Sequence, residues 1–165
     1  MKNANSPVLN PFPPVSDGHS KVLILGSLPS EASRAAGFYY MHPHNRFWKV
    51  MSALFGESFP TMSAEEKAAA LLSHGIALSD VVQTCEIHRS SDASIKEVVP
   101  TAVPDLLAHS EIEKILLNGK TAYRLFLKHF PSLADRAILL PSTSPANAAV
   151  SLEELIKRWG DALRE

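Results

Sequence analysis

The fold is decided by the stretch Lys21-Val22-Leu23-Ile24-Leu25-Gly26-Ser27-Leu28-Pro29-Ser30. Its residues 22–25 form a continuous aliphatic run, which is typical of a parallel strand that is covered on both faces. The glycine and the proline that follow this run predict a turn at the carboxyl end of the strand. We therefore expect a buried strand that opens an α/β domain.

The same aliphatic pattern recurs later in the chain, and helical patterns lie between the repeats. Further strands are predicted over residues 76–82, 114–117 and 137–140. Helices are predicted over residues 45–55, 64–74, 101–109, 120–130 and 151–163. Strands that alternate with helices indicate an α/β fold, here a three-layer α/β/α sandwich around a short, mostly parallel four-stranded sheet.

Two helix starts and one long polar segment complete this outline. Ser63 with Glu66, and Ser151 with Glu154, have the spacing of a capping box at the start of a helix. Residues 84–99 are polar and lack hydrophobic periodicity, so we expect an irregular connection there.

The composition fits a single domain with a separate N-terminal arm. The chain has 165 residues, and residues 1–20 hold four of its twelve prolines without any periodicity. We expect residues 1–20 to form a proline-rich arm or loop, and residues 21–165 to form one α/β domain.

Composition also narrows the class of protein. One cysteine excludes a disulfide framework and a cysteine-ligated zinc or iron–sulfur site. No apolar run reaches the roughly 18 residues that span a bilayer, and no secretory signal is visible, so we expect a cytoplasmic protein without a membrane partner. The net charge of −1 gives no electrostatic argument for a nucleic-acid partner.

A dense aromatic block follows the first strand: Tyr39-Tyr40-Met41-His42-Pro43-His44-Asn45-Arg46-Phe47-Trp48. Five of the chain's twelve aromatic residues lie between Phe38 and Trp48, a density that indicates a pocket rather than a plain connection. Asn45 precedes a predicted helix, so it is either an N-cap or a pocket residue, and one side chain can serve both roles. Tyr39 and Tyr40 are either core aromatics or a stacking platform for a flat ligand.

The ends of the predicted strands carry small and polar residues. In open α/β sheets, ligands bind outside the carboxyl ends of the strands. Those ends are Gly26-Ser27-Leu28-Pro29, Ser79-Asp80, Asn118-Gly119 and Pro141-Ser142-Thr143-Ser144. Three of the four carry small or amide side chains that could admit a ligand.

Two common catalytic motifs are absent from the sequence. Asn118-Gly119-Lys120-Thr121 resembles the end of a phosphate-binding loop, but Lys114 occupies the position where that motif requires its first glycine. No Gly-x-Ser-x-Gly elbow is present, so a hydrolase with a serine nucleophile has no support.

A metal site is also not favoured. The candidate ligands would be two pairs, His42 with His44 and Cys85 with His88. Their spacing matches no known zinc site, and carboxylates do not cluster nearby. We interpret these histidines as hydrogen-bonding groups within loops, and we expect no metal.

Three motifs in order resemble those of the uracil-DNA glycosylase superfamily. They are Gly26-Ser27-Leu28-Pro29, His42-Pro43-His44-Asn45-Arg46-Phe47-Trp48-Lys49-Val50 and Leu140-Pro141-Ser142-Thr143-Ser144-Pro145-Ala146-Asn147. The aromatic block is similar to that of mismatch-specific uracil and thymine glycosylases. The final loop and Leu28 resemble the hypoxanthine-DNA (deoxyinosine) glycosylase branch. The resemblance spans about residues 21–163.

The resemblance implies roles for individual residues. Leu28 stands where much of the superfamily has an Asp, Asn or Gln that places the hydrolytic water, and leucine cannot do this. In the deoxyinosine branch the residue that matches Asn45 is the implied catalytic residue. The implied base-binding residues are Gly26, Ser27, Leu28, Pro29, Tyr40 and Asp80, with Tyr40 stacking on the base. The implied DNA-binding residues, which hold phosphates or fill the gap in the duplex, are Ser142, Thr143, Ser144, Pro145, Ala146 and Asn147.

Asp80 suggests a further hypothesis about the substrate. A carboxylate at this position would accept a hydrogen bond from N1–H of hypoxanthine and repel the N1 lone pair of adenine. It would equally accept from N3–H of uracil, so it does not decide between these two bases. Alternatively, Asp80 caps backbone amides at the end of its strand.

The resemblance therefore implies a monofunctional DNA glycosylase that acts on a deaminated base, most readily hypoxanthine, as a monomer without metal or cofactor. Its partner would be DNA that contains the deaminated base. One alternative is a glycosylase specific for uracil or for G:U and G:T mismatches. A second is a nucleic-acid-binding module without activity, which Leu28 and the nearly neutral charge keep open.

Overall fold

A parallel four-stranded sheet forms the centre of the molecule. The computed structural model describes residues 6–9, 12–87 and 96–164. The sheet consists of β2 (Val22–Gly26), β3 (Ile76–Asp80), β6 (Lys114–Asn118) and β7 (Ala137–Leu140). Its strand order is β3-β2-β6-β7, and every neighbouring pair is parallel. The predicted four-stranded sheet is thereby confirmed.

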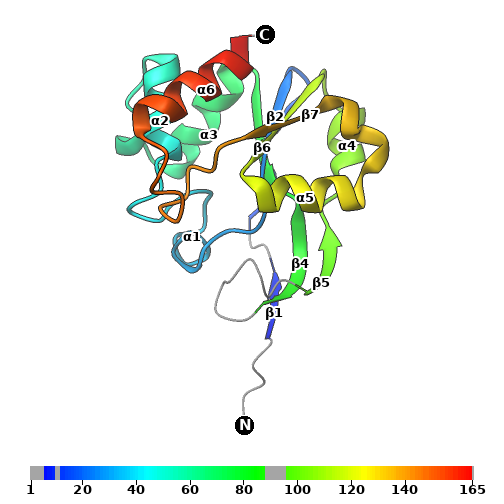
Figure 1. Cartoon of the computed structure of the whole chain (residues 1–165). Helices are drawn as coiled ribbons and strands as arrows, with labels where there is room; N and C mark the ends of the chain where they lie inside the picture. The colour runs from blue at the N-terminus through cyan, green and yellow to red at the C-terminus, as the bar shows by residue number, and fades with distance from the viewer. Residues whose placement is uncertain (1–5, 10–11, 88–95, 165) are drawn as a thin grey trace.

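Helices cover both faces of this sheet and complete the three-layer sandwich (Figure 1). One face carries α2 (Phe47–Phe55), α3 (Ala64–Ser73) and α6 (Leu152–Arg164). The other face carries α4 (Val103–Ala108) and α5 (Lys120–His129). All five helices were predicted from their spacing, with ends that differ by at most two residues.

Two separate hydrophobic clusters follow from the alternation of side chains along the strands. In β2, Ile24 packs into the cluster under α2, α3 and α6, whereas Leu23 and Leu25 pack into the cluster under α4 and α5. All three are completely buried. Because both faces are covered, the strand contains no polar residue until its carboxyl end.

A second, antiparallel sheet corrects the expectation of an irregular connection at residues 84–87 and 96–99, while residues 88–95 of that connection lie outside the described residues. Its strands are β1 (Ser6–Leu9), β4 (Val82–Ile87) and β5 (Lys96–Pro100), in the order β1-β4-β5. The strand predicted over residues 76–82 accordingly ends at Asp80, and β4 begins at Val82. An antiparallel ladder is held by backbone hydrogen bonds, which polar sequences form without any hydrophobic pattern.

Part of the N-terminal arm belongs to the packed structure. Besides β1, Phe12 and Val15 lie in the hydrophobic cluster that contains Ile24. Val15 pairs with Leu78 through backbone hydrogen bonds of 2.8 Å in both directions. The predicted arm or loop over residues 1–20 therefore contains a strand and two core residues, and the division of the chain at residue 21 stays a prediction.

The predicted capping box at the start of α3 is confirmed. Ser63 Oγ accepts from the Glu66 backbone N–H at 3.1 Å, and Glu66 Oε1 accepts from the Ser63 N–H at 3.0 Å. Three short helices were not predicted: α1 (Glu31–Ala36), η1 (Phe59–Thr61) and η3 (Pro131–Arg136). None of the helices in the described part of the chain has the length and apolar character needed to cross a membrane.

Candidate functional site

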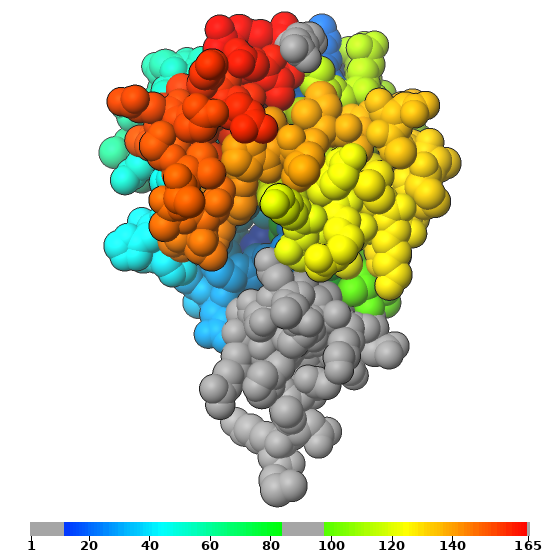
Figure 2. Space-filling view, in the orientation of Figure 1, coloured from blue at the N-terminus to red at the C-terminus, as the bar shows by residue number. Residues whose placement is uncertain are grey.

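A pocket of about 950 Å³ opens at the carboxyl ends of the parallel strands. Figure 2 shows it as a hollow between the loop that precedes α6 and the start of α5. Its lining includes the following residues: Gly26, Ser27, Leu28, Pro29, Ser30, Tyr40, Asn45, Asp80, Asn118, Gly119, Lys120, Thr121, Ser142, Thr143, Ser144, Ala146, Asn147 and Arg158. The position agrees with the general rule for ligand sites in open α/β sheets.

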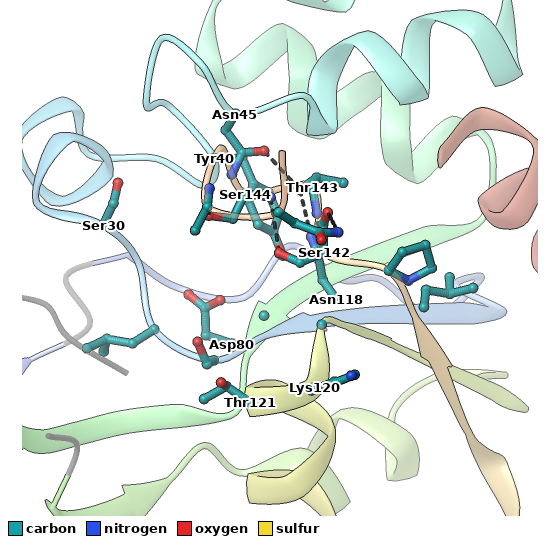
Figure 3. A pocket seen from close by; sticks show the side chains of 18 of the residues that line it. Ser30, Tyr40, Asn45, Asp80, Asn118, Lys120, Thr121, Ser142, Thr143 and Ser144 are labelled. Atoms are coloured by element: carbon teal, nitrogen blue, oxygen red, sulfur yellow. Dashed lines mark hydrogen bonds between the residues drawn. The ribbon is translucent and has the colours of Figure 1, made fainter. Parts of the chain in front are cut away.

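Gly26 allows two polar groups to meet on the floor of this pocket. Gly26 and Asp80 are paired at the ends of β2 and β3. A Cβ atom on Gly26 would lie 2.6 Å from Asp80 Oδ1 and 2.8 Å from the Tyr40 hydroxyl oxygen, so a side chain there would displace both. Figure 3 shows the Asp80 carboxylate directed into the pocket. The residue itself is only 2% exposed.

Tyr40 is held by its backbone and by an aromatic neighbour. Its φ of 56° lies in the left-handed region, which is unusual for a residue other than glycine and marks a functional or strained position. Its ring stacks on Phe47 with 4.1 Å between the centroids. The hydroxyl is buried and makes no hydrogen bond to the described residues. Burial, and after it the charge of Asp80, raises the pKa of Tyr40 well above its usual value, so the hydroxyl stays protonated.

Asn45 holds the start of α2 and lines the pocket. Its Oδ1 accepts a hydrogen bond of 2.9 Å from the backbone N–H of Phe47, in the first turn of α2. The same oxygen accepts a second bond of 2.9 Å from the Thr143 hydroxyl. Within the described residues, Nδ2 of Asn45 donates to no other group. The N-cap position of α2 is Arg46, so Asn45 is not the predicted N-cap; its oxygen holds the first helical N–H from one residue further back, and the side chain also lines the pocket.

Thr143 links Asn45 to the end of β6. Its hydroxyl accepts a bond of 3.0 Å from Asn118 Nδ2, and its backbone N–H donates to Asn118 Oδ1 at 3.0 Å. Thr143 is fully buried and Asn118 is 9% exposed. The dashed lines in Figure 3 follow this connection between the three side chains. The resemblance implied a DNA contact for Thr143; its hydroxyl is buried and bonded to two side chains of the protein, and the implied contact stays a prediction.

Arg46 fastens the loop of residues 141–150 to the start of α2. Its guanidinium donates to the backbone carbonyls of Val150 and Asn147, the latter at 2.9 Å. Its backbone N–H donates to the Thr143 carbonyl at 3.0 Å. The loop that the resemblance assigns to DNA is therefore held in place by the residue next to Asn45.

The wall formed by residues 26–30 combines an apolar side chain with a helix cap. Leu28 lines the pocket and packs against the cluster under α4 and α5, so it supplies shape but no hydrogen bond. Ser30 Oγ accepts from the Ser33 backbone N–H at 3.1 Å and caps α1. These contacts fix the turn that the glycine and the proline predicted.

Two cationic side chains lie at the rim. Lys120 begins α5, directly after Gly119, whose φ of 97° only glycine adopts readily. Arg158 lies on α6, and its side chain is 53% exposed. Both line the pocket, and Arg158 Nη1 also lies 3.9 Å from Glu154 Oε1 in an ion pair along α6.

The histidines of the aromatic block form a turn. The backbone N–H of His44 donates to His42 Nδ1 at 3.1 Å. No cluster of three or more His, Cys, Asp or Glu side chains occurs among the residues that the structure describes. His88 and the side chain of Cys85 lie outside those residues.

Most of the predicted site residues meet in this one pocket. Of those implied by the resemblance, Pro145 alone is not part of the lining. Roles for Asn118, Lys120 and Arg158 were not predicted. The sequence did place Asn118 at a strand end, and that position could have identified it; Arg158, in the middle of α6, carries no such signal.

The fold and the pocket define an α/β protein with a polar ligand site at the carboxyl ends of parallel strands. The family model described as the uracil DNA glycosylase superfamily matches residues 13–162, and the chain belongs to this superfamily.

Solved and curated relatives agree with this assignment. The chain is 30% identical over 162 residues to a hypoxanthine DNA glycosylase of Methanosarcina barkeri, a match that covers 93% of this chain and 96% of the relative. It is 32% identical to a hypoxanthine DNA glycosylase of Methanosarcina acetivorans, with 85% and 89% covered. The solution NMR structure of a proposed uracil DNA glycosylase from Methanosarcina acetivorans superimposes with a TM-score of 0.78 at 29% identity, with 93% and 97% covered.

Proposed function

We propose that this protein is a monofunctional DNA glycosylase that removes deaminated bases from DNA, with hypoxanthine as its main substrate. The observation that carries the proposal is the meeting of Asn45, Asp80 and Tyr40 in one pocket beside the loop of residues 142–147. Two relatives that are 30% and 32% identical bear the name hypoxanthine DNA glycosylase, which supports the choice of base.

The reaction would be a hydrolysis at C1′ of the deoxyribose. The nucleotide first leaves the duplex, because its glycosidic bond cannot be reached within the stack. The C1′–N9 bond then breaks and its electron pair moves onto the base, while water forms the new C1′–O bond and gives up a proton to the departing base. The transition state is oxocarbenium-like. We assign Asn45 as the catalytic residue that stabilises it by preorganised hydrogen bonding.

Asp80 and Tyr40 would recognise the base. The carboxylate of Asp80 would accept from N1–H of hypoxanthine and repel the N1 lone pair of adenine, which selects the deaminated purine. The ring of Tyr40, supported from behind by Phe47, would stack on the extruded base. Gly26, Ser27, Leu28 and Pro29 would complete the wall around it. That set is part of the observed lining.

The loop before α6 would contact the DNA backbone. Ser142, Ser144, Pro145, Ala146 and Asn147 remain the proposed contact residues, and Lys120 and Arg158 bring positive charge to the same rim. For Thr143 we propose a role inside the protein, because its side chain is buried.

Excision assays across matched oligonucleotides test the proposal. Duplexes that carry one inosine, xanthosine or uracil should yield an abasic product, fastest for inosine, and the rate should persist in EDTA and in a monomeric fraction. If no substrate yields an abasic site, the alternative of a binding module without activity is correct.

A uracil or mismatch glycosylase is the second candidate, because Asp80 could also accept from N3–H of uracil. Asp80→Asn separates recognition from simple packing, since it keeps the shape and changes one acceptor into a donor. We expect hypoxanthine excision to fall relative to adenine, by about tenfold per charged hydrogen bond. An unchanged ratio would show that Asp80 does not read the base.

A further inference from the structure

We propose that Asn45 works as a hydrogen-bond donor to the leaving base, and that Thr143 and Asn118 are positioning residues that hold it in this orientation. The inference rests on the proposed glycosylase function and adds to it the direction of the catalytic hydrogen bond. It also assigns an internal role to two residues outside direct contact with the base.

Two backbone amides fix the direction of both asparagine side chains. A backbone N–H can only donate, so the atom that it meets must be the amide oxygen. The N–H of Phe47 meets Asn45 at 2.9 Å, and the N–H of Thr143 meets Asn118 at 3.0 Å. Each oxygen is therefore assigned by its partner, and each nitrogen lies on the opposite side of its amide.

The hydroxyl of Thr143 connects the two amides and couples their orientations. Asn118 Nδ2 donates to it at 3.0 Å, so its single hydrogen is free to point only at Asn45 Oδ1, which lies 2.9 Å away. We call this chain of hydrogen bonds from Asn118 through Thr143 to Asn45 the relay. It is fully buried at Thr143, where no water competes for these bonds. Asn45 Oδ1 then accepts two hydrogen bonds, which use both of its lone pairs.

As a consequence, the amide NH₂ group of Asn45 faces the pocket. Asn45 is part of the lining, and Figure 3 shows its nitrogen on the side that faces the pocket. As the C1′–N9 bond breaks, negative charge gathers on the nitrogen and oxygen atoms of the base, and a donor lowers the energy of that charge. If Asn45 instead oriented the attacking water by accepting a hydrogen bond from it, it would need Oδ1. That oxygen already accepts from the Phe47 N–H and the Thr143 hydroxyl.

The Asn45→Asp variant distinguishes a donor from an acceptor. Aspartate keeps the shape and both accepted bonds, offers a stronger acceptor to water, and has no NH₂ group. In single-turnover excision from an inosine duplex, we expect Asn45→Asp to be as slow as Asn45→Ala. If Asn45→Asp retains a tenth or more of the wild-type rate, the donor assignment is wrong.

The relay is tested by variants that leave Asn45 in place. Thr143→Val removes the hydroxyl at nearly constant shape, and Asn118→Asp removes the donor that sets its direction. We expect each to lower the single-turnover rate about 10- to 100-fold through misorientation, with unchanged affinity for DNA, while Thr143→Ser recovers most of the rate. Thr61→Val, at an exposed threonine in η1, is the matched control.

The outcomes separate this inference from the function on which it rests. An inactive wild-type protein contradicts the glycosylase itself. An active wild type with a fully active Thr143→Val, or a Thr143→Val defect that lies in DNA affinity alone, contradicts the relay. Thermal unfolding of each variant shows that it is folded, and Asn45→Asp decides the donor question even where Thr143→Val does not fold.

Discussion

The starts of α2 and α3 both have backbone N–H groups that find no partner within the helix, and the two starts satisfy them in different ways. At α3, Ser63 and Glu66 exchange two hydrogen bonds, and both residues are exposed at the surface. At α2, Asn45 satisfies one backbone N–H but keeps its NH₂ group for the pocket. Ser63 and Glu66 use their side chains entirely for the helix, and Asn45 does not. A polar side chain at a helix start therefore indicates a functional site when it keeps a polar group that the helix does not use.

The largest expected effect comes from Asn45→Ala. Removal of one preorganised donor typically costs about 10²–10³ in rate, and loss of the hydrogen bond to the Phe47 N–H costs about 1 kcal/mol of stability. We expect a folded protein whose single-turnover excision from an inosine duplex falls by at least that factor. Near-normal turnover would remove the distinction between the two helix starts.

The Gly26→Ala variant disturbs the floor of the pocket without touching either cap. The added Cβ would meet Asp80 and Tyr40 at under 3 Å, and such overpacking costs about 1–3 kcal/mol. We expect slower excision and a lower free energy of unfolding, measured by single-turnover kinetics and urea denaturation. Gly18→Ala is the control, because the nearest atom to its Cβ would be 3.9 Å away.

The Ser63→Ala variant is the structural counterpart of Asn45→Ala. It should lower the free energy of unfolding by about 1 kcal/mol, which moves the melting temperature by about 2–4 °C for a chain of this size. Excision should be unchanged, because neither Ser63 nor Glu66 lines the pocket. A clear loss of excision with Ser63→Ala would mean that helix capping alone explains the effect at Asn45.

The smallest expected effect is a pH dependence confined to α3. Hydrogen bonds from Ser63 lower the pKa of Glu66 below its usual value of 4.5. A carboxylate with a lowered pKa stabilises the folded state above its unfolded pKa, and this contribution disappears as the pH falls through the folded value. Urea midpoints of wild type and Glu66→Gln should differ at pH 7 and converge under acid conditions. Asn45 does not titrate and adds no such dependence.

The sequence predicted the central sheet because each strand is an aliphatic run. Residues 23–25 and 115–117 are completely buried, so the aliphatic run alone identified these central strands, whereas the edge strand over residues 137–140 is partly exposed, with Leu139 at 38%. The β4 and β5 strands gave no such signal, because the sequence over residues 84–99 is polar. Their pairing also contains register shifts. Pairing of this kind depends on partners that are distant in the sequence, and hydrophobic periodicity does not record it.

The site was predicted in its parts but not in its connections. Asn45 and Asp80 could be identified from their positions at a helix start and at a strand end, together with the resemblance. The bond between Asn45 and Thr143 joins residues that are 98 positions apart, and no local pattern contains it. The same holds for Arg46, whose partners Asn147 and Val150 are 101 and 104 positions away.

The contacts of Arg46 also bear on the thermodynamics of DNA binding. A loop of hydroxyl and amide residues is normally mobile, and ordering each of its residues on binding would cost about 1–2 kcal/mol of conformational entropy. Because Arg46 already holds two of its carbonyls, much of that entropy is lost during folding rather than at the encounter with DNA. Binding of this loop to the DNA backbone should then be fast and carry a small entropic penalty. Most of the binding energy would remain available for extruding the base.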